Sequence, residues 1–188
     1  VLMIQHEPIC FSSRVELLQH QLKGGVVAEI GVHCGDFAQR ILDIVKPDVF
    51  YLVDIWPNKE IGNGVFYNGL VCKEMVEKRF ANEIATGKIK LLQCESTDAY
   101  KYINQLSLDW LYLDTSHWYP STLHELRALR GLIKLRGHIF GHDYNYIMPR
   151  LGFSGVERAV TEFIAETGLR LDTLTMESIC NSFGILIE

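Results

Sequence analysis

Short apolar runs alternate with amphipathic patterns along the chain. In the runs, several apolar residues follow one another, whereas in the longer stretches apolar residues recur every three or four positions. The first pattern is typical of strands buried on both faces, and the second of helices with one apolar side. We therefore expect strands at residues 26–30, 49–53, 89–93, 109–114, 138–142, 170–175 and 182–187.

Helices are expected before the first strand and between most of the others. The first covers residues 13–22, where Ser13 and Glu16 have the spacing of a capping box and Leu18 and Leu22 share an apolar side. The remaining helices are expected at residues 37–45, at 66–85, just after 96, from 120 onward, and after a cap formed by Ser154 and Glu157.

This order of elements predicts an α/β fold. Buried strands that alternate with helices form a parallel sheet covered on both faces, and the last two strands, joined by a short turn, form an antiparallel hairpin. We expect one Rossmann-like domain over residues 1–188, with an N-terminal helix within 10–23 and a seven-stranded core over 25–188. Ligands of such sheets bind at the carboxyl ends of the strands, where the strand order reverses.

Composition narrows the class of protein. A formal net charge of −5 gives no overall attraction for nucleic acid, and no apolar run is long enough to span a membrane. The first residues lack the pattern of a signal peptide. The five cysteines are odd in number and contain no CxxC pair, so we expect neither a disulfide framework nor a zinc site, and we place the protein in the reducing cytoplasm.

The end of the first strand has the residues of a nucleoside-binding loop. Gly31 allows a tight turn, and Gly35 leaves free amides at the start of a helix, although the GxGxxG fingerprint is not met. Glu29 lies inside an apolar strand, where an unpaired carboxylate is costly. Asp54 ends the next strand and can accept hydrogen bonds from ribose hydroxyls. The alternatives are an ordinary strand-to-helix turn, and a helix cap or solvated acid at Asp54.

The fourth and fifth strands end in acids and histidines. Asp114 ends one strand with His117 three residues on, and His142 and Asp143 end the other. Neighbouring parallel strands are about 4.8 Å apart, so the two acids can converge on one cation, and an oxygen-lined site suits Mg²⁺, Mn²⁺ or Ca²⁺. Alternatively, Asp114 caps a helix or binds a cofactor amine, and the histidines are packed or structural.

Two motifs carry a family resemblance. EIGVHCGDFAQRIL followed by YLVDIW resembles the first two motifs of class I S-adenosylmethionine (SAM)-dependent methyltransferases. The resemblance implies that Glu29 and Gly31 lie near the methionine part of SAM and that Asp54 holds its ribose. It also implies adenine contacts from Glu95 and Ser96, for which the alternative is a helix cap by Ser96.

A longer pattern resembles one branch of that family. DTSHWYPSTLHELRALRGLIKLRGHIFGHDY and GVERAVTEF resemble a branch that includes sugar O-methyltransferases, several of which need Mg²⁺. The resemblance implies that His117 is the general base. Two residues depart from the branch: Arg136 replaces a glycine, and Tyr144 follows Asp143 where metal-dependent members have a third ligand. His142 or Asn145 is then the substitute ligand.

The sequence thus favours methyl transfer from SAM to an oxygen or nitrogen of a small polar acceptor. The resemblance to the branch implies a sugar as this acceptor, with a divalent metal as a further expectation. The alternatives are a metal-independent enzyme of the same fold and a catalytically silent binding protein, whereas an NAD-dependent dehydrogenase is disfavoured. The segments 56–64 and 145–155 follow strand ends, so we expect them to overhang the pocket. Arg150 is a candidate for holding an anionic group on the acceptor. The oligomeric state stays open.

Overall fold

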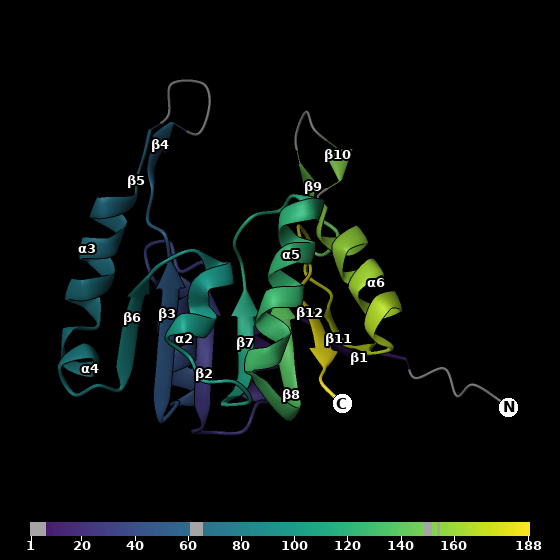
Figure 1. The fold of residues 1–188 in the computed structure, drawn as a ribbon, viewed down its shortest axis with the longest axis horizontal. Coiled ribbons are helices and arrows are strands. Elements are labelled where there is room, and N and C mark those ends of the chain that lie inside the picture. Colours follow the sequence, from purple (N-terminus) through teal and green to yellow (C-terminus); the bar gives the residue numbers. More distant parts are fainter. Residues whose placement is uncertain (1–6, 61–65, 149–151, 154) are drawn as a thin grey trace, which may run out of the picture.

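The computed structural model describes residues 7–60, 66–148, 152–153 and 155–188. Its main sheet consists of β1 (Ile9–Phe11), β2 (Val26–Ile30), β3 (Val49–Asp54), β6 (Ile89–Gln93), β7 (Leu108–Leu113), β8 (Ile133–Gly141), β11 (Arg170–Thr175) and β12 (Phe183–Leu186). These eight strands are ordered β1-β11-β12-β8-β7-β2-β3-β6 (Figure 1).

The sheet is mostly parallel, as predicted. β2 pairs in parallel with both β3 and β7, whereas β12 is antiparallel to β8 and to β11 and forms the C-terminal hairpin. From β2 the chain first builds outward through β3 and β6, and then returns to β7 and β8 on the other side. The strand order therefore reverses between β2 and β7, which is where sheets of this class bind ligands.

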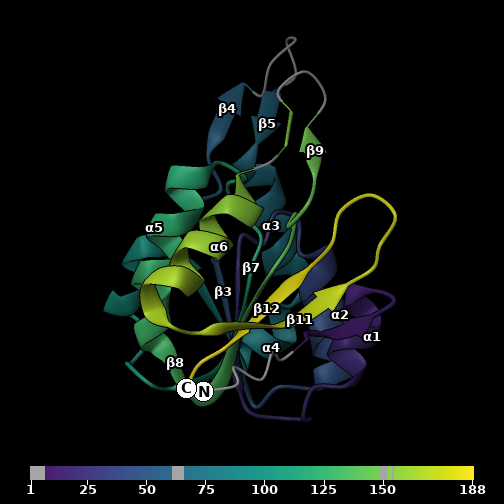
Figure 2. The ribbon, with the colours of Figure 1, turned by 90° about the vertical axis from the view of Figure 1, so that its right-hand side faces the viewer.

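Helices cover both faces of the sheet. They are α1 (Arg14–Gln19), α2 (Asp36–Val45), α3 (Gly69–Arg79), α4 (Ala81–Ala85), α5 (Tyr119–Leu129) and α6 (Val156–Thr167), with short 3-10 helices η1 (Ser96–Lys101) and η2 (Arg130–Leu132). Leu17, Ile41 and Val76 bury the apolar sides of α1, α2 and α3 in one core, and Leu126 and Phe163 bury those of α5 and α6 in another. Figure 2 shows α1 and α2 on the side of the sheet opposite to α5 and α6.

Several predicted boundaries differ from the structure. The first helix ends at Gln19, so Leu22 lies beyond it and is 89% exposed. Ser13 caps this helix as predicted by accepting from the Glu16 amide, but the Glu16 carboxylate accepts from Ser12 instead of closing the capping box.

Residues 66–85 form three elements in place of one helix. The chain first forms the short strand β5 (Phe66–Asn68), then α3, then α4. The Asn68 side chain accepts a hydrogen bond from the Val71 amide and so starts α3 later than expected. The final helix begins after Gly155, while the predicted cap Ser154 lies outside the described residues.

Two small ribbons stand at the carboxyl end of the sheet. β4 (Asn58–Glu60) pairs with β5, and β9 (Ile147–Met148) pairs with β10 (Gly152–Phe153), both antiparallel. In Figures 1 and 2 both ribbons rise beyond the ends of β3 and β7. The described parts of the two segments expected to overhang a pocket thus include β4 in one and β9 and β10 in the other, while Arg150 lies outside the described residues.

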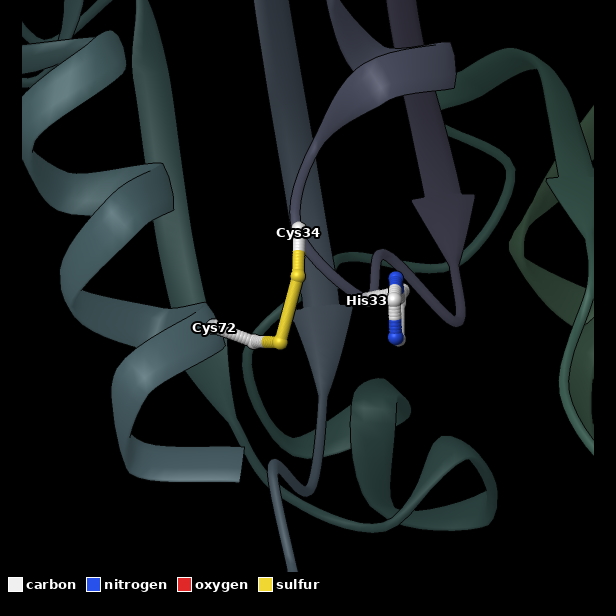
Figure 3. Close-up of side chains that lie close together, drawn as sticks. All are labelled: His33, Cys34 and Cys72. Atoms are coloured by element: carbon white, nitrogen blue, oxygen red, sulfur yellow. A yellow bond between two sulfur atoms is a disulfide. The ribbon is translucent and has the colours of Figure 1, made fainter. Parts of the chain in front are cut away.

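The structure contains a disulfide between Cys34 and Cys72, so the expectation of no disulfide, which rested on the number and spacing of the cysteines, was wrong. Cys34 lies in the loop after β2 and Cys72 in α3, 38 residues later (Figure 3). Their meeting depends on how α3 packs beside that loop, which residue spacing alone does not determine.

None of the helices in the described part of the chain has the length and apolar character needed to span a membrane.

Candidate active site

The loop after β2 approaches the end of β7 closely. Gly31 has a φ of +92°, and a Cβ there would collide with the main-chain carbonyl of Asp114. Glycine is therefore needed here both for its positive φ, as the predicted tight turn requires, and because a side chain would strike the neighbouring strand end. Gly35, with a φ of +81°, forms the N-cap of α2, where a Cβ would crowd the ring of Phe80.

Asp54 anchors this loop. Its Oδ2 accepts hydrogen bonds from the amides of Val32 (2.8 Å) and His33 (2.9 Å), and its Oδ1 accepts from the amide of Trp56 (2.7 Å). A carboxylate offers about four acceptor positions, so about one is left for a ribose hydroxyl. Asp54 is therefore neither a helix cap nor a solvated acid. It holds the loop in shape and keeps an oxygen at the cavity.

A cavity of about 500 Å³ opens between the ends of β2, β3, β6 and β7. It lies at the predicted position, where the strand order reverses. The predicted site residues that line it are Gly31, Asp54, Glu95, Ser96 and Asp114.

Glu125 of α5 also lines this cavity, and sequence reasoning missed it. It is only 5% exposed and accepts hydrogen bonds from the hydroxyls of Ser96 (2.6 Å) and Thr115 (2.8 Å). Burial raises its pKa, against the effect of these two hydroxyls. The Ser96 hydroxyl is thus engaged by Glu125. One feature of the sequence could have indicated Glu125, because this acid lies on the apolar side of a helix, next to the buried Leu126.

The acid Glu29 and the cation Arg14 both lie close to Asp114. Glu29 is 2% exposed, and its Oε2 has no hydrogen-bond partner among the described residues. Burial, followed by the negative charge of Asp114, raises the pKa of Glu29 well above its usual range. Arg14, which the sequence did not single out, lies 3.9 Å from Asp114 and stacks 4.7 Å over the ring of Phe37. A buried acid and a cation therefore both face the end of β7.

Four predicted side chains meet at the ends of β7 and β8 and form an acid–histidine cluster of Asp114, His117, His142 and Asp143. Nε2 of His117 lies 2.8 Å from Asp143 and 3.9 Å from Asp114. Nδ1 of His142 lies 3.5 Å from Asp143 and 3.8 Å from Asp114. Hydrogen bonding to Asp114 and Asp143 raises the pKa of His117 to about 10. Although burial opposes ionisation, contacts with both histidines keep the pKa of Asp143 well below its usual range.

This electrostatic environment corrects one expectation. The general-base interpretation assumed that His117 has an ordinary pKa near 6.5 and is largely neutral near pH 7. In the structure the two neighbouring carboxylates raise this pKa, so His117 can accept a proton near pH 7 only where their charge is offset, for example by a bound cation.

The same cluster meets the first requirement of a metal site. One ligand atom from each of Asp114, His117 and Asp143 lies within 4.8 Å of the others. The predicted oxygen-lined site is in fact mixed, because imidazole nitrogens join the carboxylates, and this mixture favours Mn²⁺ over Mg²⁺. The other proposed substitute ligand, Asn145, uses its amide oxygen to accept from the Asn181 amide.

Residues 28–144 match the model of a family described as a methyltransferase domain, and the chain belongs to this family. No curated protein sequence matches the chain.

Solved structures of similar fold agree with the family. A Streptococcus mutans protein in complex with S-adenosylhomocysteine (SAH) has a TM-score of 0.64 at 11% identity, over 92% of this chain and 94% of its own. A SAM-dependent methyltransferase from Aquifex aeolicus has a TM-score of 0.64 at 14% identity, over 93% and 88%. An rRNA methylase from Streptococcus thermophilus has a TM-score of 0.61 at 10% identity, over 93% and 95%. The chain therefore has the Rossmann-like fold of SAM-dependent methyltransferases.

Proposed function

We propose that this protein transfers a methyl group from SAM to an oxygen of a small polar acceptor, a sugar or a sugar-containing metabolite, in the cytoplasm. The observation that carries the proposal is the cavity at the strand-order reversal, which collects Gly31, Asp54 and Asp114 beside the acid–histidine cluster. The cofactor supplies an electrophilic methyl group on a sulfonium, and the protein positions the acceptor oxygen in line with it.

The charges around the cavity fit the parts of SAM. Asp54 keeps about one acceptor position for a ribose hydroxyl, and Glu95 and Ser96 line the wall assigned to adenine. The partnerless Oε2 of Glu29 suits the ammonium of the methionine part, since a buried acid is stabilised by an opposite charge. Arg14 suits the methionine carboxylate. Glu29, Arg14 and Asp54 would therefore hold the two ends of one zwitterionic nucleoside.

The cluster at the ends of β7 and β8 is the proposed acceptor side. Its carboxylates and imidazoles offer the dense hydrogen bonding that a sugar with several hydroxyls requires. Asp114, Asp143 and His142 would hold a divalent cation, which would supply Lewis acidity toward an acceptor hydroxyl. His117 is the proposed general base for the hydroxyl proton, in the state in which a cation held by the carboxylates offsets the negative charge that raises its pKa. In the metal-independent alternative, the same residues orient the acceptor by hydrogen bonds alone.

Calorimetric titration with SAH and with NAD is the first test. We expect SAH to bind and NAD not to bind. Transfer of labelled methyl from SAM to a panel of sugars, with mass spectrometry of the products, then identifies the acceptor. Binding of NAD in place of SAH would overturn the proposal. SAH binding without transfer to any acceptor would favour the silent binding protein.

A further inference from the structure

Cys34, Cys72 and His33 form a second cluster, which the proposed methyl transfer does not use. The two cysteines are joined by a disulfide, and a ring nitrogen of His33 lies within 4.8 Å of both sulfur atoms. Figure 3 shows His33 and Cys34 on the loop after β2, and Cys72 reaching that loop from α3. Cys72 is buried and His33 is exposed, so the cluster spans from the core to the surface.

The main chain of His33 is fixed in an uncommon conformation. Its φ is +54°, which few residues other than glycine adopt. The His33 amide donates to Asp54 (2.9 Å), and its carbonyl accepts from Nε1 of the Trp56 side chain (2.9 Å). Such conformations persist only where the surroundings impose them, and they cluster at functional sites. Here the imposed conformation presents the imidazole beside two sulfurs.

Two cysteine sulfurs and one imidazole are the ligand set of a thiophilic metal. Zn²⁺ takes thiolate and imidazole ligands in tetrahedral geometry, and sites with three protein ligands leave the fourth position open to water. We propose that Cys34, Cys72 and His33 bind one thiophilic divalent cation such as Zn²⁺ when the cysteines are reduced, and that the disulfide is the metal-free form of this site.

The interconversion balances with a thiol as the reductant. Two thiols of low molecular weight reduce the Cys34–Cys72 bond by exchange, and they leave as one disulfide. The two protein thiols then lose their protons as the cation binds. Oxidation by a small disulfide reverses both steps and releases the cation and two small thiols.

The proposed metal site adjoins the cofactor cavity through His33. This residue lines the cavity, and its amide is held by Asp54, the anchor of the loop. Binding of a cation by its side chain would therefore reinforce the loop conformation that Asp54 imposes. The site differs from the acid–histidine cluster in ligand type, because it is dominated by sulfur whereas that cluster contains two carboxylates.

Cobalt titration of the full chain tests the proposal directly. After reduction with a phosphine under anaerobic conditions, Co²⁺ should bind with a thiolate-to-cobalt charge-transfer band that saturates at one ion per chain. Cys34→Ser and Cys72→Ser should lose most of this band, while His33→Ala should keep a thiolate band but bind the ion more weakly. Protein with its disulfide intact should show no such band. Oxidised glutathione should release the ion as two thiols of the protein are lost and two molecules of reduced glutathione form.

Cys180→Ser is the matched control, because Cys180 belongs to the other candidate cluster with His142 and Asp143. It should keep the full band. A reduced wild-type protein without a thiolate band, or one whose band survives in Cys34→Ser and Cys72→Ser, would overturn the proposal. Unfolding of a variant is detected by circular dichroism. In that case the zinc content of the wild type before and after oxidation decides instead. An unchanged number of zinc ions per chain contradicts the proposal, because the proposed ligands of the acid–histidine cluster are carboxylates and an imidazole, which do not oxidise to a disulfide, and that cluster keeps any ion of its own.

Discussion

Nε2 of His117 lies 2.8 Å from Oδ2 of Asp143, and this contact joins the loops that follow β7 and β8. Asp143 is buried and has a φ of +57°, so its main chain adopts a conformation uncommon for aspartate. A buried carboxylate needs a partner, and His117 is the nearer of the two imidazoles that provide one. His117 therefore orients Asp143 in addition to any role in proton transfer.

Removal of His117 should separate these two roles. We expect His117→Ala to lower turnover by about 10²- to 10⁴-fold, the usual contribution of a general base, with SAH affinity nearly unchanged. His117→Gln keeps a hydrogen-bond donor for Asp143 but accepts no proton at physiological pH. Equal losses in both variants would assign proton transfer to His117. Recovery of turnover in His117→Gln would show that this residue only positions Asp143.

Metal dependence is expected at the acid–histidine cluster. Activity should fall in EDTA and return with added divalent cation, more fully with Mn²⁺ than with Mg²⁺, since imidazole nitrogens lie among the carboxylates. Asp143→Asn should abolish this recovery. Cys34→Ser should retain it, which separates this cluster from the sulfur site. Full turnover in chelator, with an identified acceptor, would establish the metal-independent alternative.

Asp54 should affect both cofactor affinity and stability. Asp54→Ala removes the acceptor of three backbone amides together with the proposed ribose contact. We expect SAH binding to weaken by roughly 1.5–3 kcal/mol, the value of a hydrogen bond to a charged group, and the melting temperature of the cofactor-free protein to fall. Asp43→Asn on the exposed side of α2 is the matched control. Unchanged SAH affinity in a folded Asp54 variant would remove Asp54 from the ribose site.

The sheet was predictable because its strands are marked locally. β2, β6 and β11 have the boundaries expected from sequence; β2, for example, lies between Gly25 and Gly31. β1 was missed because three residues carry too little pattern, and this strand exists through its parallel pairing with β11. The shortened first helix and the β4–β5 ribbon likewise depend on packing beyond the local sequence.

The candidate site was predictable where residues end strands. Asp54, Asp114 and Asp143 were found because the carboxyl ends of parallel strands meet at one edge. Arg14 and Glu125 were not found, because they reach the site from helices distant in sequence, and their roles appear only through contacts with Asp114 and Ser96. The pairing of Cys34 with Cys72 was missed for a similar reason, since Cys72 reaches the loop of Cys34 from α3, 38 residues later.

The last residue considered is Glu29, which should make the stability of the protein depend on pH. Because burial raises its folded-state pKa, the folded protein binds a proton here more tightly than the unfolded chain. The resulting stability is fully present below the ordinary pKa of about 4.5 and is lost as the pH rises toward the raised value. Cofactor-free Glu29→Gln should therefore melt at a higher temperature than the wild type at pH 8, and the difference should shrink as the pH falls toward 4.5.

The same variant should bind the cofactor less well. Glu29→Gln loses the charge proposed to face the ammonium of SAM, so SAH affinity should fall by roughly 1.5–3 kcal/mol, about 10- to 150-fold. Arg14→Met should weaken SAH binding, because it removes the cation proposed to pair with the carboxylate of the cofactor's amino-acid part. Methylthioadenosine lacks both groups, so its affinity should be unchanged in either variant, which provides an internal control for folding. Equal weakening of both ligands would show that Glu29 and Arg14 shape the loop, and unchanged SAH affinity would place the methionine part of the cofactor elsewhere.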